Sequence, residues 1–194
     1  MTRKSDRQGS VVIVSGPSGV GKSTICRGMV DRLAGAYLSV SATTRAKSEG
    51  EVDGEDYWFV SEEEFRRRID EGLLLEHAEV FGNLYGTPRD KVEEVLEAGG
   101  TVILEIDVQG ARKVKSSFPD AIMIFILPPS AKVLAERLGG RGRDDAEIAE
   151  ERLGGASAEI AAAWQYYQHM VINDNLQQAI DECVKIIKSA KCES

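Results

Sequence analysis

A glycine-rich turn between a short apolar run and a helical stretch constrains this chain more than any other feature. Residues 16–23, GPSGVGKS, match the pattern G-x-x-x-x-G-K-[ST] at every fixed position. The preceding residues 11–15 (VVIVS) have the β-branched composition of a buried strand, and a helix is expected from about residue 21 to residue 33. A strand, a glycine loop and a helix in this order are the required context of a phosphate-binding loop.

The loop predicts a site for a nucleoside triphosphate. Its glycines let successive backbone N–H groups point at phosphate oxygens, and the helix N-terminus adds partial positive charge. Lys22 is expected to reach the β- and γ-phosphates and Ser23 to bind Mg²⁺. The expected nucleotide-binding residues of this segment are Gly16, Pro17, Ser18, Gly19, Val20, Gly21, Lys22, Ser23 and Thr24. The motif alone does not define the reaction.

Strand and helix patterns alternate along most of the chain, which predicts an α/β fold with a mostly parallel sheet. Further strands are expected at residues 37–40, 56–60, 73–81, 101–107, 121–127 and 170–172. Further helices are expected at residues 62–70, 87–98, 109–118, 130–138, 145–169 and 176–189. The strands between about residues 37 and 87 come too close together for this rhythm, which indicates an inserted β-rich subdomain.

Local signals refine three of these helices. Ser61 and Glu64 form a capping box at the start of the 62–70 helix. Pro88 is expected at the first position of the next helix. The long helix over residues 145–169 is expected to be interrupted or bent near Gly154 and Gly155.

Composition and charge exclude several other classes of protein. The chain has 194 residues, 42% of them hydrophobic, which suits one packed domain. No apolar run approaches the ~20 residues of a membrane helix, and no secretory signal precedes the first strand. The net charge of −8 argues against a general nucleic-acid binder. Cys26, Cys183 and Cys192 lack ligand spacing and are expected to be reduced thiols in a cytoplasmic protein.

Three classes of nucleotide-dependent protein fit the loop: a switch GTPase, a motor-type ATPase and a small-molecule kinase. Residues 107–110 (DVQG) satisfy the D-x-x-G element of a GTPase, but no N-K-x-D element follows. A kinase needs a second pocket and a lid that excludes water. The inserted block and the arginine- and glycine-rich residues 139–145 (GGRGRDD) could supply both.

At residues 41–45 (SATTR) and 50–57 (GEVDGEDY) the sequence resembles the guanylate kinase family. The likeness continues through residues 82–87 (GNLYGT), 106–110 (IDVQG) and 171–174 (VIND), and it covers nearly the whole chain. The resemblance implies transfer of a phosphoryl group from ATP to GMP, giving ADP and GDP. It also implies a P-loop NTPase-type core (residues 10–36 and 88–190), a GMP-binding insert (about 37–87) and a mobile lid (about 139–153), within a single domain over residues 1–194.

The resemblance assigns roles to residues beyond the phosphate loop. Those matching family positions that hold guanine are Ser41, Glu76, Thr87 and Asp107. Those matching positions that hold the GMP phosphate are Arg45, Tyr57 and Tyr85, and Glu51 is expected among the substrate contacts. The lid-side arginines that match are Arg137, Arg141 and Arg152, expected to act with Lys22 and Arg45 in catalysis. Asn173 and Asp174 match the segment beside adenine.

The chemistry of guanine independently supports Glu76 as a residue that binds the base. Guanine presents N1–H and N2–H₂ as donors, and one carboxylate can accept from both, whereas adenine has an acceptor at N1. Hydroxyls such as those of Ser41 and Thr87 can donate to guanine O6. The plainer alternatives are that Glu76 is a solvated strand residue and that Tyr57 and Tyr85 are core aromatics. Asp107, at the end of a buried strand, could serve either the base or Mg²⁺.

One position departs from the family pattern. Guanylate kinases usually place a second arginine three residues after the position of Arg45, where this chain has Ser48, preceded by Lys47. Either Lys47 supplies the missing charge to the GMP phosphate, or Arg45 with the two tyrosines suffices and GMP binds more weakly.

A rival reading comes from another class of protein. Guanylate-kinase-like domains also occur as non-catalytic binding modules, which typically have a damaged phosphate loop. The loop here is intact, so the enzyme is the favoured reading, with GMP and ATP as its small-molecule partners, no nucleic acid and no membrane. A monomer or a small homo-oligomer is expected.

Overall fold

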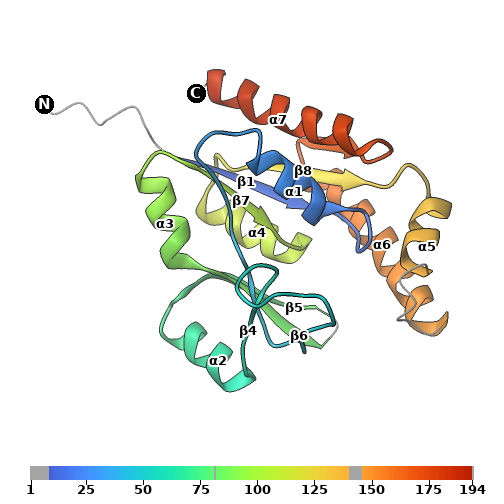
Figure 1. The fold of residues 1–194 in the computed structure, drawn as a ribbon, viewed down its shortest axis with the longest axis horizontal. Helices are drawn as coiled ribbons and strands as arrows, with labels where there is room; N and C mark the ends of the chain where they lie inside the picture. The colour runs from blue at the N-terminus through green and yellow to red at the C-terminus, as the bar shows by residue number, and fades with distance from the viewer. Residues whose placement is uncertain (1–8, 81, 140–145, 194) are drawn as a thin grey trace, which may run out of the picture.

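A computed structural model describes the backbone of residues 9–80, 82–139 and 146–193 (Figure 1). The side chains of residues 138, 139, 146–153, 158 and 193 lie outside this description. The described residues form a five-stranded sheet and a separate four-stranded sheet. None of the described helices is long and apolar enough to cross a membrane. The thiols of all three cysteines are unpaired.

The larger sheet has the strand order β2-β7-β1-β8-β9, and every neighbouring pair is parallel. Its strands are β1 (Ser10–Ser15), β2 (Ala36–Leu38), β7 (Thr101–Glu105), β8 (Ile122–Leu127) and β9 (His169–Ile172). The central strand β1 is buried on both faces, which explains its run of β-branched residues. The predicted α/β fold with a parallel sheet is confirmed.

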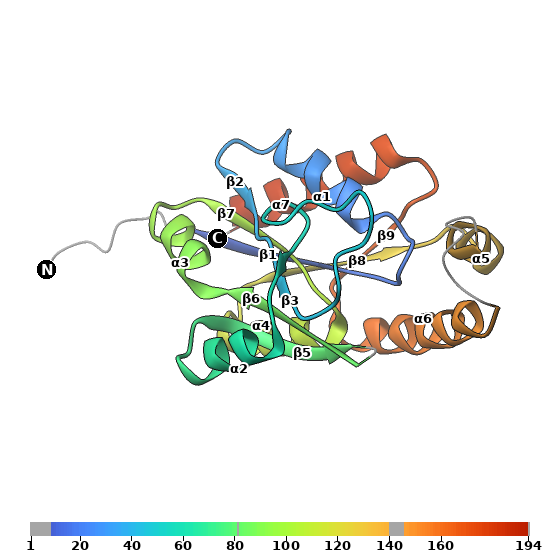
Figure 2. The same ribbon diagram turned by 60° about the horizontal axis from the view of Figure 1, so that its bottom comes forward.

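Helices cover both faces of this sheet (Figure 2). The first face carries α1 (Lys22–Val30) and α7 (Leu176–Glu193), and the second carries α3 (Arg89–Glu97), α4 (Val108–Ser117) and α6 (Ala146–Tyr166). Because side chains alternate along a strand, Val12 and Val14 of β1 pack toward the first layer and Val11 and Ile13 toward the second. The helix α5 (Ala131–Gly139) packs on α6 through Leu134.

The smaller sheet lies at the edge of the α3–α4 layer (Figure 1) and has the order β4-β3-β6-β5. Its strands are β3 (Ala42–Thr43), β4 (Trp58–Phe59), β5 (Leu74–Val80) and β6 (Asn83–Pro88). The helix α2 (Glu62–Asp70) closes a small core in which Phe65 packs on Ala42 and Leu74. Ser61 caps this helix by accepting from the Glu64 amide at 3.1 Å, which confirms Ser61 as the N-cap. The Glu64 carboxylate, expected to complete a capping box, accepts from Arg67 and Arg68 instead.

Several elements differ from the sequence expectation. The strands β3 and β6 were not expected, because residues 42–43 are too few for a pattern and residues 83–88 contain both glycine and proline. Pro88 is the residue before α3 and not its first helical residue, so the helix begins at Arg89 rather than at residues 87–88 as expected. The helix α6 continues through Gly154 without interruption. Finally, β2 pairs with β7 in the larger sheet, so Tyr37 lies there and not in the smaller sheet.

Candidate active site

The phosphate loop joins the end of β1 to the start of α1, as its motif predicts. Gly16 has a φ of +151°, and a Cβ there would lie 2.4 Å from the Ile126 carbonyl oxygen, so glycine is required. Gly21 caps α1 in the left-handed region, with a φ of +96°. The Asn173 side chain, just beyond β9, donates from Nδ2 to the Val20 carbonyl oxygen at 2.8 Å. The loop and Asn173 therefore meet at the carboxyl edge of the larger sheet.

Lys22 folds back over this loop. Its Nζ donates to the carbonyl oxygens of Gly16 at 2.6 Å and Pro17 at 3.0 Å. The ammonium group thus lies at the N-terminus of α1, where the helix dipole also favours anions. Burial raises the pKa of Glu159 on α6, with Lys22 opposing the shift and Asp107 reinforcing it. Lys22 and Asp107 are therefore electrostatic neighbours of one partly buried carboxyl group.

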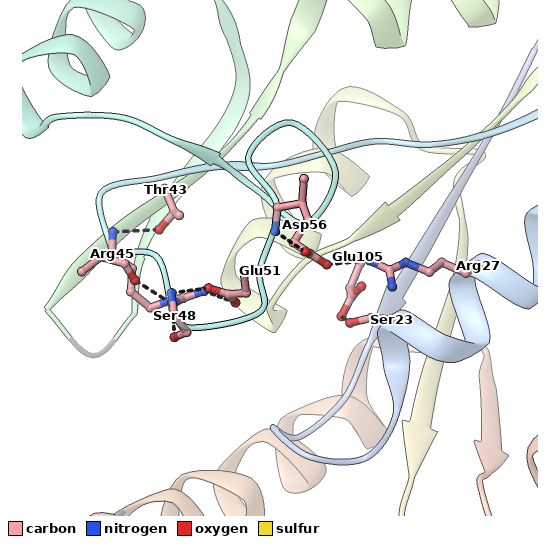
Figure 3. A network of polar contacts seen from close by, with 10 residues as sticks. Ser23, Arg27, Thr43, Arg45, Ser48, Glu51, Asp56 and Glu105 are labelled. Carbon is pink, nitrogen blue, oxygen red and sulfur yellow. Dashed lines mark hydrogen bonds and ion pairs between the residues drawn. The ribbon is translucent and has the colours of Figure 1, made fainter. Parts of the chain in front are cut away.

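Ser23 makes a contact that the motif does not specify. Its Oγ donates to Oε1 of Glu105 at 2.9 Å (Figure 3). Glu105 is the last residue of β7, so its carboxylate lies at the same edge of the sheet as the loop. The Ser23 hydroxyl and the Glu105 carboxylate are both oxygen ligands of the kind that Mg²⁺ prefers, and they lie close together.

Arg137 approaches the loop from α5. Its Nη1 donates to the Val20 carbonyl oxygen at 3.5 Å and its Nη2 to the Asn173 carbonyl oxygen at 3.3 Å. Asp174, the next residue, is exposed. Arg141 and the Arg152 side chain fall outside the described residues, so their predicted roles stay predictions.

A buried carboxylate lies in the smaller sheet. Glu76 on β5 is only 6% exposed, and Thr87 on the paired strand β6 donates from Oγ1 to its Oε1 at 2.8 Å. Burial raises the pKa of Glu76 to about 7, the Thr87 hydrogen bond opposes the rise, and Asp107 reinforces it. The alternative of a solvated strand residue is therefore wrong for Glu76.

Asp107 caps the helix α4. Its Oδ1 accepts from the backbone amides of Gln109 at 2.6 Å and Gly110 at 3.2 Å. This fixes the carboxylate at the start of α4, just beyond the carboxyl end of β7, where its charge acts on Glu76. The two functional regions expected from the sequence thus converge at one edge of the larger sheet, which is the usual place for a ligand site in such folds.

The Arg45 guanidinium is held in a polar loop beside the smaller sheet (Figure 3). Its Nη2 donates to Glu51 at 2.7 Å, and its Nη1 donates to the Ser48 hydroxyl at 3.1 Å. The Ser48 amide donates to the other oxygen of Glu51 at 2.7 Å. The contact with Arg45 lowers the pKa of Glu51 and raises that of Arg45. Lys47 is exposed.

Aromatic rings line the same side of this loop. The Arg45 guanidinium carbon lies 5.3 Å from the centre of the Tyr57 ring, and the Tyr57 and Tyr85 rings meet edge to face with centres 5.9 Å apart. Burial raises the pKa of the Tyr57 hydroxyl, and the Glu105 carboxylate adds to the rise. Ser41 precedes β3, and its carbonyl oxygen accepts from the Trp58 amide at 2.9 Å. The sequence-predicted phosphate contacts Arg45, Tyr57 and Tyr85 therefore lie together.

Comparison with known proteins agrees with this arrangement. A sequence model described as guanylate kinase matches residues 8–190. The chain belongs to the guanylate kinase family. It is 49% identical over 180 residues to a guanylate kinase of Synechocystis sp., covering 93% of this chain and 94% of that protein. It is also 49% identical over 182 residues to a guanylate kinase of Rubrobacter xylanophilus, covering 94% and 95% of the two chains.

A solved structure supports the same family. The crystal structure of guanylate kinase from Anaplasma phagocytophilum superposes with a TM-score of 0.81 at 34% sequence identity, and the match covers 95% of this chain and 87% of that chain. The resemblance found from the sequence motifs is confirmed.

Sequence reasoning missed three polar residues of this guanylate kinase fold. Glu105 could have been found, because it ends a buried strand two residues before Asp107. Arg27 and Asp56 had no such signal. Arg27 on α1 forms an ion pair of 2.5 Å with Asp56, which precedes β4, so this contact connects the two sheets' regions (Figure 3).

Proposed function

We propose that this chain transfers the terminal phosphoryl group of ATP to GMP and yields ADP and GDP. One observation supports this proposal most directly. The Glu76 carboxylate is buried, accepts a hydrogen bond from the Thr87 hydroxyl, and lies near the edge of the larger sheet that carries the intact phosphate loop. Family membership supports the reaction, and the geometry supports the division of roles among the side chains.

The ATP phosphates bind the loop between β1 and α1. Backbone amides and the α1 N-terminus receive the phosphate oxygens, and Lys22 exchanges its contacts to the Gly16 and Pro17 carbonyl oxygens for contacts to phosphate. Asn173 and Asp174 lie beside the adenine, and Arg137 lies close enough to Val20 to reach the phosphates. Arg141 and Arg152 are expected to add positive charge from the lid.

Ser23 and Glu105 fit Mg²⁺ as oxygen ligands, 2.9 Å apart at the mouth of the loop. Across the described ranges, no group of three or more His, Cys, Asp and Glu side chains gathers to hold a metal. When bound, Mg²⁺ would neutralise negative charge on the ATP phosphates.

GMP binds between the smaller sheet and the phosphate loop. The ionised Glu76 accepts from guanine N1–H and N2–H₂. The Ser41 hydroxyl donates to guanine O6, while the single hydroxyl proton of Thr87 stays on Glu76 and orients it. Asp107 lies on the same side and is the second carboxylate available to the base. Adenine would place an N1 acceptor against Glu76, which disfavours AMP.

The GMP phosphate meets Arg45, Tyr57 and Tyr85. Arg45 is already oriented by Glu51 and Ser48, so little side-chain ordering remains when the phosphate arrives. A phosphate oxygen of GMP attacks the γ-phosphorus of ATP while the bond to the ADP oxygen breaks. No general base is needed, because the GMP phosphate is already ionised; the protein's task is alignment and neutralisation of charge.

An assay coupled to ADP formation tests the function directly. ATP with GMP should give rapid ADP formation, and ATP with AMP or with no acceptor should give little. The same measurement on Lys22→Ala controls for contaminating kinases. If the wild-type protein forms no ADP with GMP, the chain is a non-catalytic member of the family and the proposed function is wrong.

A further inference from the structure

Gly110 occupies a position where its own backbone does not call for glycine. It lies in the first turn of α4, buried, and its φ is outside the left-handed region. In a helix interior, alanine is favoured over glycine, because glycine loses more conformational freedom on folding. The reason for a glycine here must therefore come from what surrounds it.

The space beside Gly110 belongs to the Glu76 carboxylate. A Cβ at position 110 would lie 2.7 Å from Glu76 Oε2 and 3.2 Å from its Cδ. The next nearest atom, Cβ of Ile106, would be at 3.6 Å, which is an ordinary van der Waals distance. An added methyl group would thus collide with one functional group and with nothing else at close range.

The carboxylate has little freedom to retreat from such a methyl group. Its other oxygen accepts from Thr87 at 2.8 Å, and Glu76 and Thr87 are directly paired in the β5–β6 ladder. On the opposite side, Lys113 of α4 donates to the carbonyl oxygen of His77, the residue after Glu76. The strand β5 is therefore fixed against both β6 and α4, so the side chain, and not the strand, would have to move.

We propose that Gly110 is a positioning residue for guanine recognition. By carrying no side chain, it leaves the space in which the Glu76 carboxylate is held to face guanine N1–H and N2–H₂. This inference rests on the proposed function, because it needs Glu76 as the acceptor for guanine. It goes further by making the helix α4 of the larger unit a determinant of the base that the smaller sheet selects.

Gly110→Ala tests this through binding of GMP and ATP, each measured by calorimetry. The GMP dissociation constant should rise at least 10-fold, while that of ATP should stay within about 2-fold, because the ATP site lies on β1, α1 and β9. Gly154→Ala, a helical glycine with open space around it, is the matched control and should leave the binding of both nucleotides unchanged.

The same substitution in a Glu76→Ala background separates the steric account from a general disturbance of α4. Without the carboxylate, Gly110→Ala should change GMP binding less than 2-fold. If Gly110→Ala alone fails to fold, the double variant should fold, because the colliding group is gone. A full effect in both backgrounds, failure of both variants to fold, or unchanged GMP binding in the single variant would overturn the inference.

The single variant Glu76→Ala keeps the two proposals apart. If it binds GMP much more weakly than wild type while Gly110→Ala binds GMP normally, only the role of Gly110 is wrong. If Glu76→Ala binds GMP as tightly as wild type, the assignment of guanine to this carboxylate is itself wrong.

Discussion

Thr87 donates a hydrogen bond to Glu76 across two paired strands, at 2.8 Å between Oγ1 and Oε1, in a place almost without solvent exposure. Two effects act on the carboxyl group in opposite directions. The hydrogen bond favours the ionised form, and burial favours the neutral form. Burial has the larger effect, so the pKa of Glu76 is raised to about 7, and the free protein holds a carboxyl group that titrates near neutral pH.

The first prediction is that the titration of Glu76 makes the stability of the folded protein depend on pH. In the unfolded chain the carboxyl ionises near its usual 4.5, whereas in the folded protein it keeps its proton up to about pH 7. The folded state therefore binds more protons in this window, and its stability falls as pH rises from about 4.5 to 7. Relative to Glu76→Gln, the wild type should lose on the order of 3 kcal/mol between pH 4 and pH 8.

Urea unfolding of the two proteins, without nucleotide, measures this difference. Other titrating groups are common to both proteins and cancel in the comparison. A difference in unfolding free energy that stays constant from pH 4 to pH 8 would mean that folding does not shift the pKa of Glu76, which would contradict the prediction.

The second prediction concerns Lys22. Lys22→Ala should lower the turnover number by about 10³, because a positive charge at the transferring phosphate matters most in the transition state. The thermal melting temperature should remain near that of wild type, since the hydrogen bonds that Lys22 makes within the described part of the chain go to two loop carbonyl oxygens. Near-normal turnover would contradict the assignment of this loop to ATP.

The third prediction is that the ion pair between Arg27 and Asp56 contributes little to stability. The side chains are 58% and 26% exposed, and exposed pairs typically contribute less than about 1 kcal/mol. A double-mutant cycle with Arg27→Ala and Asp56→Asn, followed by urea unfolding, gives the coupling energy directly. A coupling well above 1 kcal/mol would show that this contact is a principal connection between the regions of the two sheets.

The fourth prediction concerns the position where this chain lacks the family's second arginine. Ser48 donates its amide to Glu51 and accepts from Arg45, so it orients the first arginine but brings no charge. Exposed Lys47 is the neighbouring cation. Lys47→Ala should raise the GMP KM about 10-fold, or about 1.4 kcal/mol, and leave the ATP KM nearly unchanged.

Two variants complete this test. Lys188→Ala removes an exposed lysine from α7, away from the loop, and should leave both KM values unchanged. Ser48→Arg should restore GMP affinity in the Lys47→Ala background. If Lys47→Ala has no effect, Arg45 with the two tyrosines suffices for the phosphate.

Much of this fold could be predicted from the sequence, because its main signals are local. The β-branched strand before the glycine loop, the helix after that loop and the N-cap at Ser61 each occupy a few adjacent residues, and each was predicted correctly. The strand β6 was not predicted, because its glycine and proline disfavour a strand. It is extended because it pairs with β3 and β5, and these partners are remote in sequence or not recognisable as strands.

The candidate site likewise contains residues that could be predicted from the sequence and residues that could not. Residue types and spacing pointed to Lys22 and Ser23, and guanine chemistry with the family resemblance pointed to Glu76. The partners of these residues come from remote parts of the chain: Glu105 lies 82 residues from Ser23, and Asp56 lies 29 residues from Arg27. The role proposed for Gly110 could not be predicted from the sequence either, because it depends on the carboxylate of Glu76, which lies on another strand.

The most direct test of the account is the preference of the enzyme for GMP over AMP, measured as the ratio of their kcat/KM values in wild type and in Glu76→Gln. The amide cannot accept from both guanine donors, so the ratio should fall by the equivalent of about 1–3 kcal/mol, or roughly 5- to 150-fold. Most of the loss should lie in the GMP value. A ratio that is the same in both proteins would contradict the claim that the buried carboxylate of Glu76 selects guanine.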